Sequence, residues 1–290
     1  MARGNRLLGT LRGKLGDTVY YRSRGYQIER PRVVPKNPRS RAQMGQRVKI
    51  ANASAVYRAL RPILSRSFAV RGQHESSFNA FSRAAMDLSP YMTKTMVAKC
   101  LALPMPVQLS RGGLGTYEYT EFQGENGLTF VRLPLYSDGA IPNVGLWTQR
   151  FLAENPQFQD GDTIVMAMIR FVKNTQVSEE DAYNAIGTFA TLQLDLSNGE
   201  PITEVGWASD STTSTILPNG WPDVNDIEAS DFIAMSGAFV SRKTESGSID
   251  VSSQYFVLTT AAKTLYEKYR SELSLDAAID SYGVGSDRVV

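Results

Sequence analysis

The side chains best suited to nucleophilic or zinc chemistry are scarce in this sequence. Its 290 residues include one cysteine, Cys100, and one histidine, His74. One cysteine cannot form an intrachain disulfide, and one histidine cannot by itself build a Cys/His zinc site or a Ser-His-Asp triad. We expect Cys100 to be a small buried side chain and His74 to have a loop or helix-capping role. Most familiar hydrolase and zinc chemistries are therefore excluded.

Two other patterns only superficially indicate ligand binding. The stretch SRGGLGTYEY, residues 110–119, is glycine-rich like a phosphate-binding loop, but no Lys-Ser or Lys-Thr follows and no helix is predicted to open there. The acidic runs 160–162 and 179–181 lack the alternating ligands and terminal glutamate of an EF-hand, and we interpret them as solvated turns. We predict no catalytic, cofactor-binding or metal-ligating residues, no small-molecule substrate and no enzymatic activity.

The charged residues are distributed unevenly along the chain. Residues 1–75 hold 17 Lys or Arg and three acids, a net charge of +14, whereas the remaining 215 residues hold 14 and 26, a net charge of −12. A basic segment can contact nucleic-acid phosphates or an acidic protein surface, including that of a neighbouring copy. The candidate residues for interface or phosphate contact are Arg3, Arg6, Arg12, Lys14, Arg22, Arg24, Arg39, Arg41 and Arg47.

The beginning of the chain predicts an arm followed by a β-hairpin. Glycines at positions 4, 9, 13 and 16 separate basic and leucine residues over 3–16, which is typical of an arm that turns often. Few apolar side chains are present to offset backbone ordering, so we expect this arm to order only against a partner. Val, Tyr and Ile on both sides of Ser23 to Gly25 predict a hairpin from Thr18 to about Arg32.

Helices are predicted next, after a connector containing Pro35 and Pro38. Apolar residues recur at helical intervals from Ser40 to about Leu60, and Pro62 should end or kink that helix. A second helix is expected over 76–88 and a third, short one over 92–101.

Beyond Leu103 the composition changes to short alternating runs separated by turn signals. This pattern predicts an antiparallel sandwich or barrel-like domain, followed by a C-terminal helix over 261–273 and a polar tail. The fold class is α+β, with a basic arm and β-hairpin (1–37), a helical region (38–103), a β domain (104–259) and a C-terminal helix and tail (260–290). Strands are expected at 107–110, 128–133, 163–171, 190–196, 233–241 and 254–259.

The N-terminal block resembles a family of small proteins from Bacteroidota and their phages. Its marks here are Gly-Lys-Leu-Gly at 13–16, Lys-Asn-Pro at 36–38 and Gln-Arg at 46–47. Weaker similarity covers FNAFSRAAM, VQLSRGGL and DFIAMSGAFVSRKTESGSIDVSSQYF, so the likeness spans most of residues 9–256. This chain departs from the family by its length beyond Phe256 and by longer loops before Ser230. The family brings no established activity.

Proteins of this type occur among the virion genes of crAss-like phages, whose short tails contain stacked rings of small subunits. The resemblance thus implies a non-enzymatic tail or neck ring subunit that is assembled in the host cytoplasm, with itself and other virion proteins as partners. Contact of the basic N-terminal region with phage DNA remains open. No window approaches the ~20 apolar residues of a bilayer crossing, so we expect no membrane-spanning segment and no secretory export.

Two other functions remain open at this point. The first is a nucleic-acid-binding module that uses the basic N-terminal residues on phosphates. The second is a carbohydrate- or surface-binding β module that uses exposed aromatics, although we expect Trp147, Trp207 and Trp221 to anchor packing.

Overall fold

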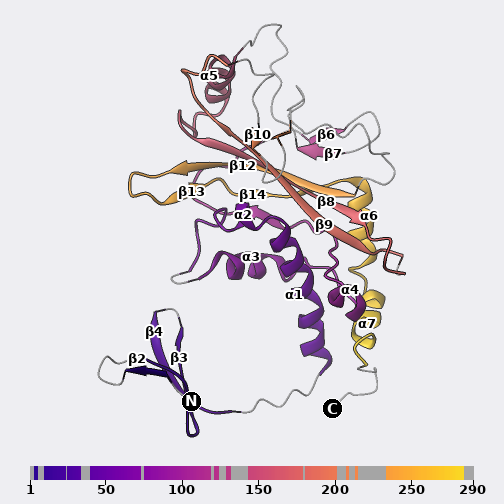
Figure 1. Cartoon of the computed structure of the whole chain (residues 1–290). Coiled ribbons are helices and arrows are strands. Elements are labelled where there is room, and N and C mark those ends of the chain that lie inside the picture. Colours follow the sequence, from indigo (N-terminus) through magenta and orange to yellow (C-terminus); the bar gives the residue numbers. More distant parts are fainter. Residues whose placement is uncertain are drawn as a thin grey trace.

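The computed structural model describes most of the chain. The described residues are 3–5, 10–23, 25–33, 40–72, 75–118, 121–123, 129–131, 143–178, 180–200, 207–208, 213–214 and 233–283. Helices and antiparallel sheets are both present, so the α+β class is confirmed (Figure 1).

The chain begins with a four-stranded antiparallel sheet, which we call the N-terminal sheet. Its strands are β1 (Arg3–Asn5), β2 (Thr10–Leu15), β3 (Thr18–Ser23) and β4 (Tyr26–Pro31). The predicted hairpin is confirmed as β3 and β4, but the prediction of an arm over 3–16 is wrong. Gly16 adopts φ +61°, a conformation that permits a tight turn, and β2 therefore folds back onto β3 of the same chain.

The helical region follows the sequence prediction closely. Helix α1 (Arg41–Ala59) begins after Ser40, whose side chain accepts a hydrogen bond from the Gln43 N–H, and α2 (Arg61–Leu64) restarts the chain at Pro62. Helices α3 (Ser77–Ala85) and α4 (Lys94–Ala98) are capped in the same way by Ser76 and Thr93. All three predicted helical stretches are confirmed.

Asn52 links α1 to the chain at the expected domain boundary. Its side chain is buried in the apolar face of the helix. Its amide donates to the Leu103 carbonyl at 3.0 Å, and its carbonyl oxygen accepts from the Leu103 N–H at 2.8 Å. Because both polar atoms of the Asn52 amide have hydrogen-bond partners, this residue connects the helical region to the following segment at little desolvation cost.

A long antiparallel sheet forms the centre of the molecule. Its strand order is β13 (Ile249–Val251), β12 (Ala234–Lys243), β8 (Thr163–Lys173) and β9 (Tyr183–Gln193), and β15 (Val257–Leu258) also pairs with β12. Strand β9 begins earlier than the predicted 190–196. Three two-stranded pairs accompany the sheet: β5 (Gln108–Ser110) with β14 (Gln254–Tyr255), β6 (Glu121–Gln123) with β7 (Thr129–Val131), and β10 (Trp207–Ala208) with β11 (Thr213–Ser214).

Strands β8 and β12 are buried on both faces, and helices contribute to both covering layers. On β8, Val165, Ala167 and Ile169 join a cluster with α1, α2 and α3. Ile164, Met166 and Met168 point the other way and join a cluster with Trp147 and Phe151 of α5 (Val144–Glu154). The sequence predicts a sandwich or barrel; the described strands form an antiparallel sheet whose faces are covered mainly by helices and loops. The first cluster contains residues from both before and after the predicted domain boundary at Leu103.

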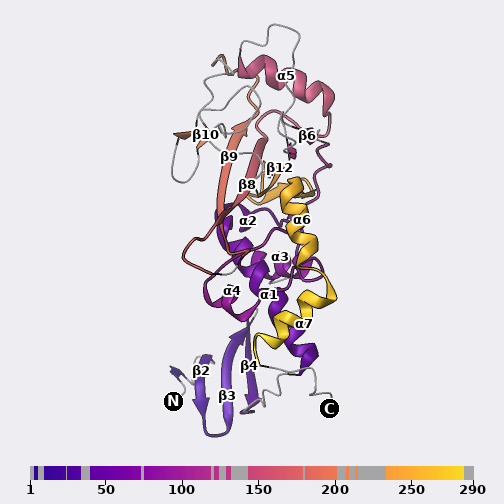
Figure 2. The same cartoon turned by 90° about the vertical axis from the view of Figure 1, so that its right-hand side faces the viewer.

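Two helices close the described chain. Helix α6 (Thr260–Lys268) corresponds to the predicted C-terminal helix, and α7 (Glu272–Asp280) replaces the first part of the expected polar tail. Ile279 of α7 packs with Met44 of α1, which explains why this segment is helical despite its weak apolar stripe. In Figure 2 the layers follow one another along the long axis: α5, the central sheet, the helices, and the N-terminal sheet at the far end.

Candidate functional site

The N-terminal sheet carries exposed side chains from Arg12 onward. From Arg12 to Leu15 of β2, and throughout β3 and β4, no residue is buried; each is exposed or intermediate. Leu15 is 48% exposed and Tyr26 is 66% exposed. The sheet therefore presents side chains for contact on both of its faces.

The strand register assigns these side chains to two different faces. Paired residues of antiparallel strands share a face and neighbours along a strand alternate, so Lys14, Val19 and Arg30 form one row across three strands. The Arg30 guanidinium carbon lies 5.3 Å from the centre of the Tyr21 ring on the same face. We name this surface the basic face, made of Arg12, Lys14, Val19, Tyr21, Ser23, Tyr26, Ile28 and Arg30.

The opposite face of the same sheet has mixed charge. It carries Leu15, Tyr20, Arg22 and Glu29. The Tyr20 hydroxyl donates to Oε1 of Glu29 at 2.9 Å, and Arg22 Nε donates to the Gly25 carbonyl at 3.3 Å. The negative charge of β4 therefore lies away from the basic face.

The nine residues predicted as contacts do not form a single site. Arg12 and Lys14 lie together on the basic face, and Arg3 pairs with Arg12 in the β1–β2 register. Arg22 lies on the opposite face. The predicted contacts at Arg6, Arg24 and Arg39 lie outside the described residues.

The two predicted contact residues in α1 lie outside the N-terminal sheet. Arg41 forms an ion pair with Asp276 of α7, and an Arg47 guanidinium nitrogen lies 3.9 Å from the Met44 sulfur. Arg30, which the candidate set omits, joins the basic face because β3 and β4 pair in the observed register. Alternation along β4 predicts that Arg30 and Ile28 share a face. It does not predict which residues of β3 lie opposite them, because that depends on the register between the two strands.

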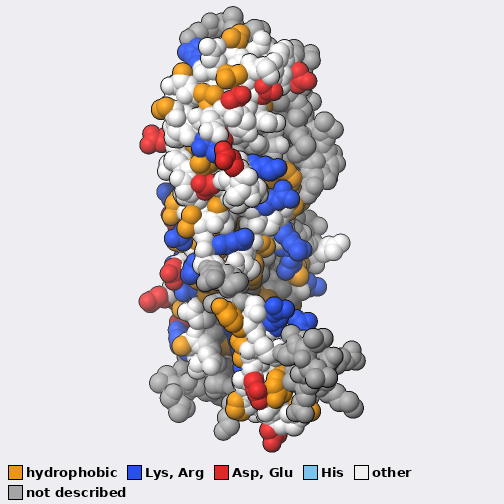
Figure 3. Space-filling model, turned by 90° about the vertical axis from the view of Figure 1, so that its left-hand side faces the viewer, with side chains coloured by type: hydrophobic (Ala, Val, Ile, Leu, Met, Phe, Trp, Pro, Cys, Tyr) orange, Lys and Arg blue, Asp and Glu red, His pale blue; other side chains and the backbone are white. Residues whose placement is uncertain are grey.

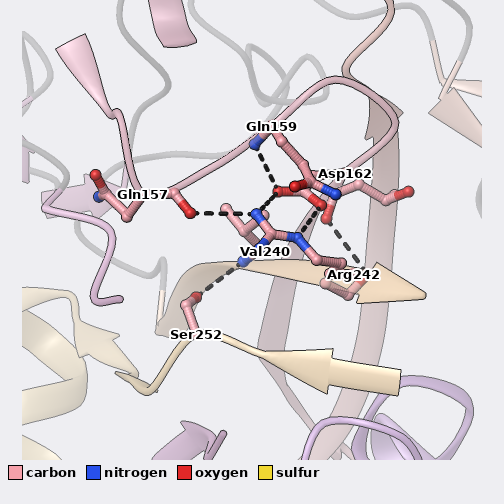
Figure 4. Close-up of polar contacts among 8 residues, drawn as sticks. Gln157, Gln159, Asp162, Val240, Arg242 and Ser252 are labelled. Atoms are coloured by element: carbon pink, nitrogen blue, oxygen red, sulfur yellow. Dashed lines mark hydrogen bonds and ion pairs between the residues drawn. The ribbon is translucent and has the colours of Figure 1, made fainter. Parts of the chain in front are cut away.

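A partly buried ion pair lies near the end of β12, where Arg242, with 23% of its side chain exposed, reaches the buried Asp162 in the loop before β8 (Figure 4). Arg242 donates to the two carboxylate oxygens of Asp162 at 2.7 and 2.6 Å and to the Gln157 carbonyl at 3.2 Å. The Gln159 N–H also donates to Asp162, at 2.9 Å. The hydrogen bond to Asp162 is the main cause that raises the pKa of Arg242. These bonds fix the loop against the sheet.

A second polar cluster joins α6 to the loop before β9. Lys268 Nζ lies 2.5 Å from Oδ2 of Asp181, and the Tyr269 hydroxyl donates to the same oxygen at 3.0 Å. The hydrogen bond to Asp181 raises the pKa of Lys268. Among the described residues, no group of three or more His, Cys, Asp and Glu side chains could hold a metal ion.

The glycine-rich stretch has a packing role in the described fold. A Cβ on Gly112 would overlap the backbone of Val251, so glycine allows the loop to approach β13 closely. The Gly113 N–H donates to Oδ1 of Asp250 at 2.8 Å. Both observations explain these glycines without a phosphate ligand.

The remaining candidate side chains have mixed outcomes. Cys100 is exposed, so the prediction of a buried thiol is wrong: α4 ends at Ala98 and Cys100 turns the chain at φ +55°. Trp147 is buried and stacks on Phe151 with ring centres 5.1 Å apart, which confirms its packing role. His74, Trp221 and the Trp207 side chain lie outside the described parts.

A hollow of about 780 Å³ lies between β14, β15 and α6. Tyr255, Lys263 and Tyr266 are among its lining residues, and Tyr255 is 57% exposed. Burial raises the pKa of Tyr266. Aromatic rings and charged groups both line this hollow.

None of the described helices is both long and apolar enough to cross a bilayer. Comparison with protein-family models, with curated proteins and with solved structures returns no match to this chain.

Proposed function

We propose that this chain is a non-enzymatic structural protein of a phage virion, a tail or neck ring subunit that contacts its neighbours through the N-terminal sheet. The observation that carries the proposal is a four-stranded sheet in which residues 12–15 of β2 and all residues of β3 and β4 are exposed or intermediate. Independent stability of a small sheet ordinarily requires a packed hydrophobic face or a covering helix. A neighbouring molecule would supply that cover.

The exposed apolar side chains at this end of the molecule support the same function. Leu15, Tyr26 and Val33 are 48%, 66% and 73% exposed, and they lie within one short stretch of chain. Leu15 and Tyr26 lie on opposite faces of the sheet, so each face offers an exposed apolar side chain to a neighbour. Subunit association would remove part of this apolar area from water.

Charge distribution and sequence resemblance provide further support. Residues 1–75 carry +14 and the remainder carries −12, so subunits that meet end to flank would attract each other. Figure 3 shows many Lys and Arg side chains through the middle of one side of the molecule, and Asp and Glu toward both ends and along one edge. The N-terminal block is also the part that resembles the phage-associated family.

The mass in solution tests the proposal. We expect light scattering on the purified full chain to give a multiple of 32.0 kDa at high concentration. Leu15→Glu should reduce the mass toward that of one chain, because it places a charge in the contact surface at a side chain that is 48% exposed in the single chain.

Leu273→Glu is the matched control, since Leu273 is 82% exposed on α7 and far from the N-terminal sheet in the chain. It should leave the mass unchanged. A mass of one chain at every concentration, or equal effects of the two substitutions, would contradict the proposal.

A further inference from the structure

The basic face carries positive charge without a compensating carboxylate. Arg12, Lys14 and Arg30 are all exposed, and among the described residues none of them forms an ion pair. Glu29, the acid of β4, lies on the opposite face. Lys14 and Arg30 lie on strands two apart, separated by about 10 Å at the usual strand spacing. The cations therefore stand on both sides of β3.

Two tyrosines lie among these cations. Tyr21 is held beneath Arg30, and Tyr26 extends from the hairpin end with 66% of its surface exposed. A positively charged surface that follows a backbone, combined with aromatic rings on which bases stack, is the usual arrangement of single-strand-binding proteins. From this arrangement we infer that the basic face binds single-stranded nucleic acid, with Arg12, Lys14 and Arg30 on phosphates and Tyr26 on a base.

The shape of the surface favours a single strand over a duplex. The basic face belongs to a four-stranded sheet, and its cations lie on β2 and β4 with β3 between them. The major groove admits an α-helix or a two-stranded ribbon, whereas a broader sheet offers a platform on which separated bases can lie.

Several carboxylates of the acidic part are already engaged within their own chain. Among the described carboxylates, Asp162, Asp181 and Asp276 pair with Arg242, Lys268 and Arg41 of their own chain. Asp160 and Asp250 accept hydrogen bonds from backbone N–H groups. The anionic partner with evenly repeated charge is a polynucleotide, and binding it releases condensed counterions.

Fluorescence anisotropy with a labelled oligothymidylate of about 20 nucleotides tests the inference on the full chain. We expect binding at about 50 mM salt that weakens steeply toward 200 mM. The triple substitution of Arg12, Lys14 and Arg30 by Ser should reduce the slope of log K against log salt by about 2, since each single-strand phosphate contact contributes about 0.7. Tyr26→Ser should weaken binding about tenfold without changing that slope.

A matched control removes the same charge elsewhere. Arg22, Arg66 and Arg71 are exposed, Arg22 lies on the opposite face, and their replacement by Ser should leave the slope nearly unchanged. The double substitution Arg12→Lys and Arg30→Lys keeps the positive charges, so it should retain the slope of log K against log salt. This variant distinguishes an effect of lost charge from an effect of unfolding the sheet.

Three results would overturn the inference. They are the absence of binding at low salt, equal effects of the two triple substitutions, and a polyglutamate competitor as effective as unlabelled oligothymidylate while Tyr26→Ser has no effect. The last result would identify the face as a site for acidic protein. Because the mass in solution is a separate readout, failure of this inference leaves the proposed assembly intact, and the reverse also holds.

Discussion

At the scale of single residues, the pair of Asp162 and Arg242 supplies the sharpest stability prediction. The Asp162 side chain is 1% exposed, so Arg242→Met would leave a carboxylate with little solvent and without its cation. Removing one partner of such a pair should lower the free energy of unfolding by about 3 kcal/mol. Urea denaturation followed by tryptophan fluorescence measures this change.

Arg41→Met is the control for that prediction. Arg41 and its partner Asp276 are 49% and 46% exposed, so water screens both charges. The substitution should change the free energy of unfolding by less than about 1 kcal/mol. Similar losses for the two variants would show that burial does not set the strength of the Asp162 pair.

The sequence predicted the location of a residue correctly where the local spacing of apolar residues determines it. The apolar spacing from Ser40 to Leu60 correctly predicted α1, but it could not indicate the buried Asn52, a polar residue whose partner Leu103 is distant in sequence. Arg30 was missed for a similar reason. Its place beside Tyr21 depends on the register between β3 and β4, which residue types alone do not specify.

At the scale of elements, Gly187 determines how closely β9 approaches the end of α1. A Cβ at this position would overlap the Ala59 carbonyl, which belongs to the backbone and cannot rotate away. Gly187→Ala should therefore destabilise the protein by about 1 to 3 kcal/mol through overpacking. Thermal unfolding monitored by circular dichroism gives the corresponding decrease in midpoint.

Gly199→Ala provides the comparison, because no atom lies within 4 Å of the Cβ it would add. Its effect should be neutral or slightly stabilising, since alanine restricts the unfolded chain. If both alanine variants unfold at the same temperature, the close approach of β9 and α1 is not a constraint on the fold.

The sequence predicted elements well where start and stop signals were strong, as at Ser40 and Pro62 around α1. It missed α5, although Asn143 caps that helix and Val144, Trp147 and Phe151 have helical spacing, because the surrounding turn signals indicated strands. It missed α7 because Leu273 and Ile279 do not share a face: one is 82% exposed and the other is buried. Helix α7 is stabilised by packing of Ile279 against Met44 of α1.

At the scale of the whole molecule, the central sheet and its two covering layers account for the main interior, and the N-terminal sheet lies beyond them at one end (Figure 2). The uneven distribution of charge along the chain was evident from the sequence. The first residues, however, were predicted to form an arm, and in the structure they contribute strands β1 and β2. The difference matters for assembly, because the strands of a sheet present their side chains on two defined faces, whereas an arm has no fixed faces.

Hydrogen–deuterium exchange of β2 to β4 in the full chain tests the central claim, that a partner covers the N-terminal sheet, most directly. We expect the amides of residues 10–31 to exchange quickly in dilute protein and to become protected at concentrations where the mass rises above 32.0 kDa, while those of β8 stay protected throughout. Assembly without any added protection of β2 to β4 would contradict the account.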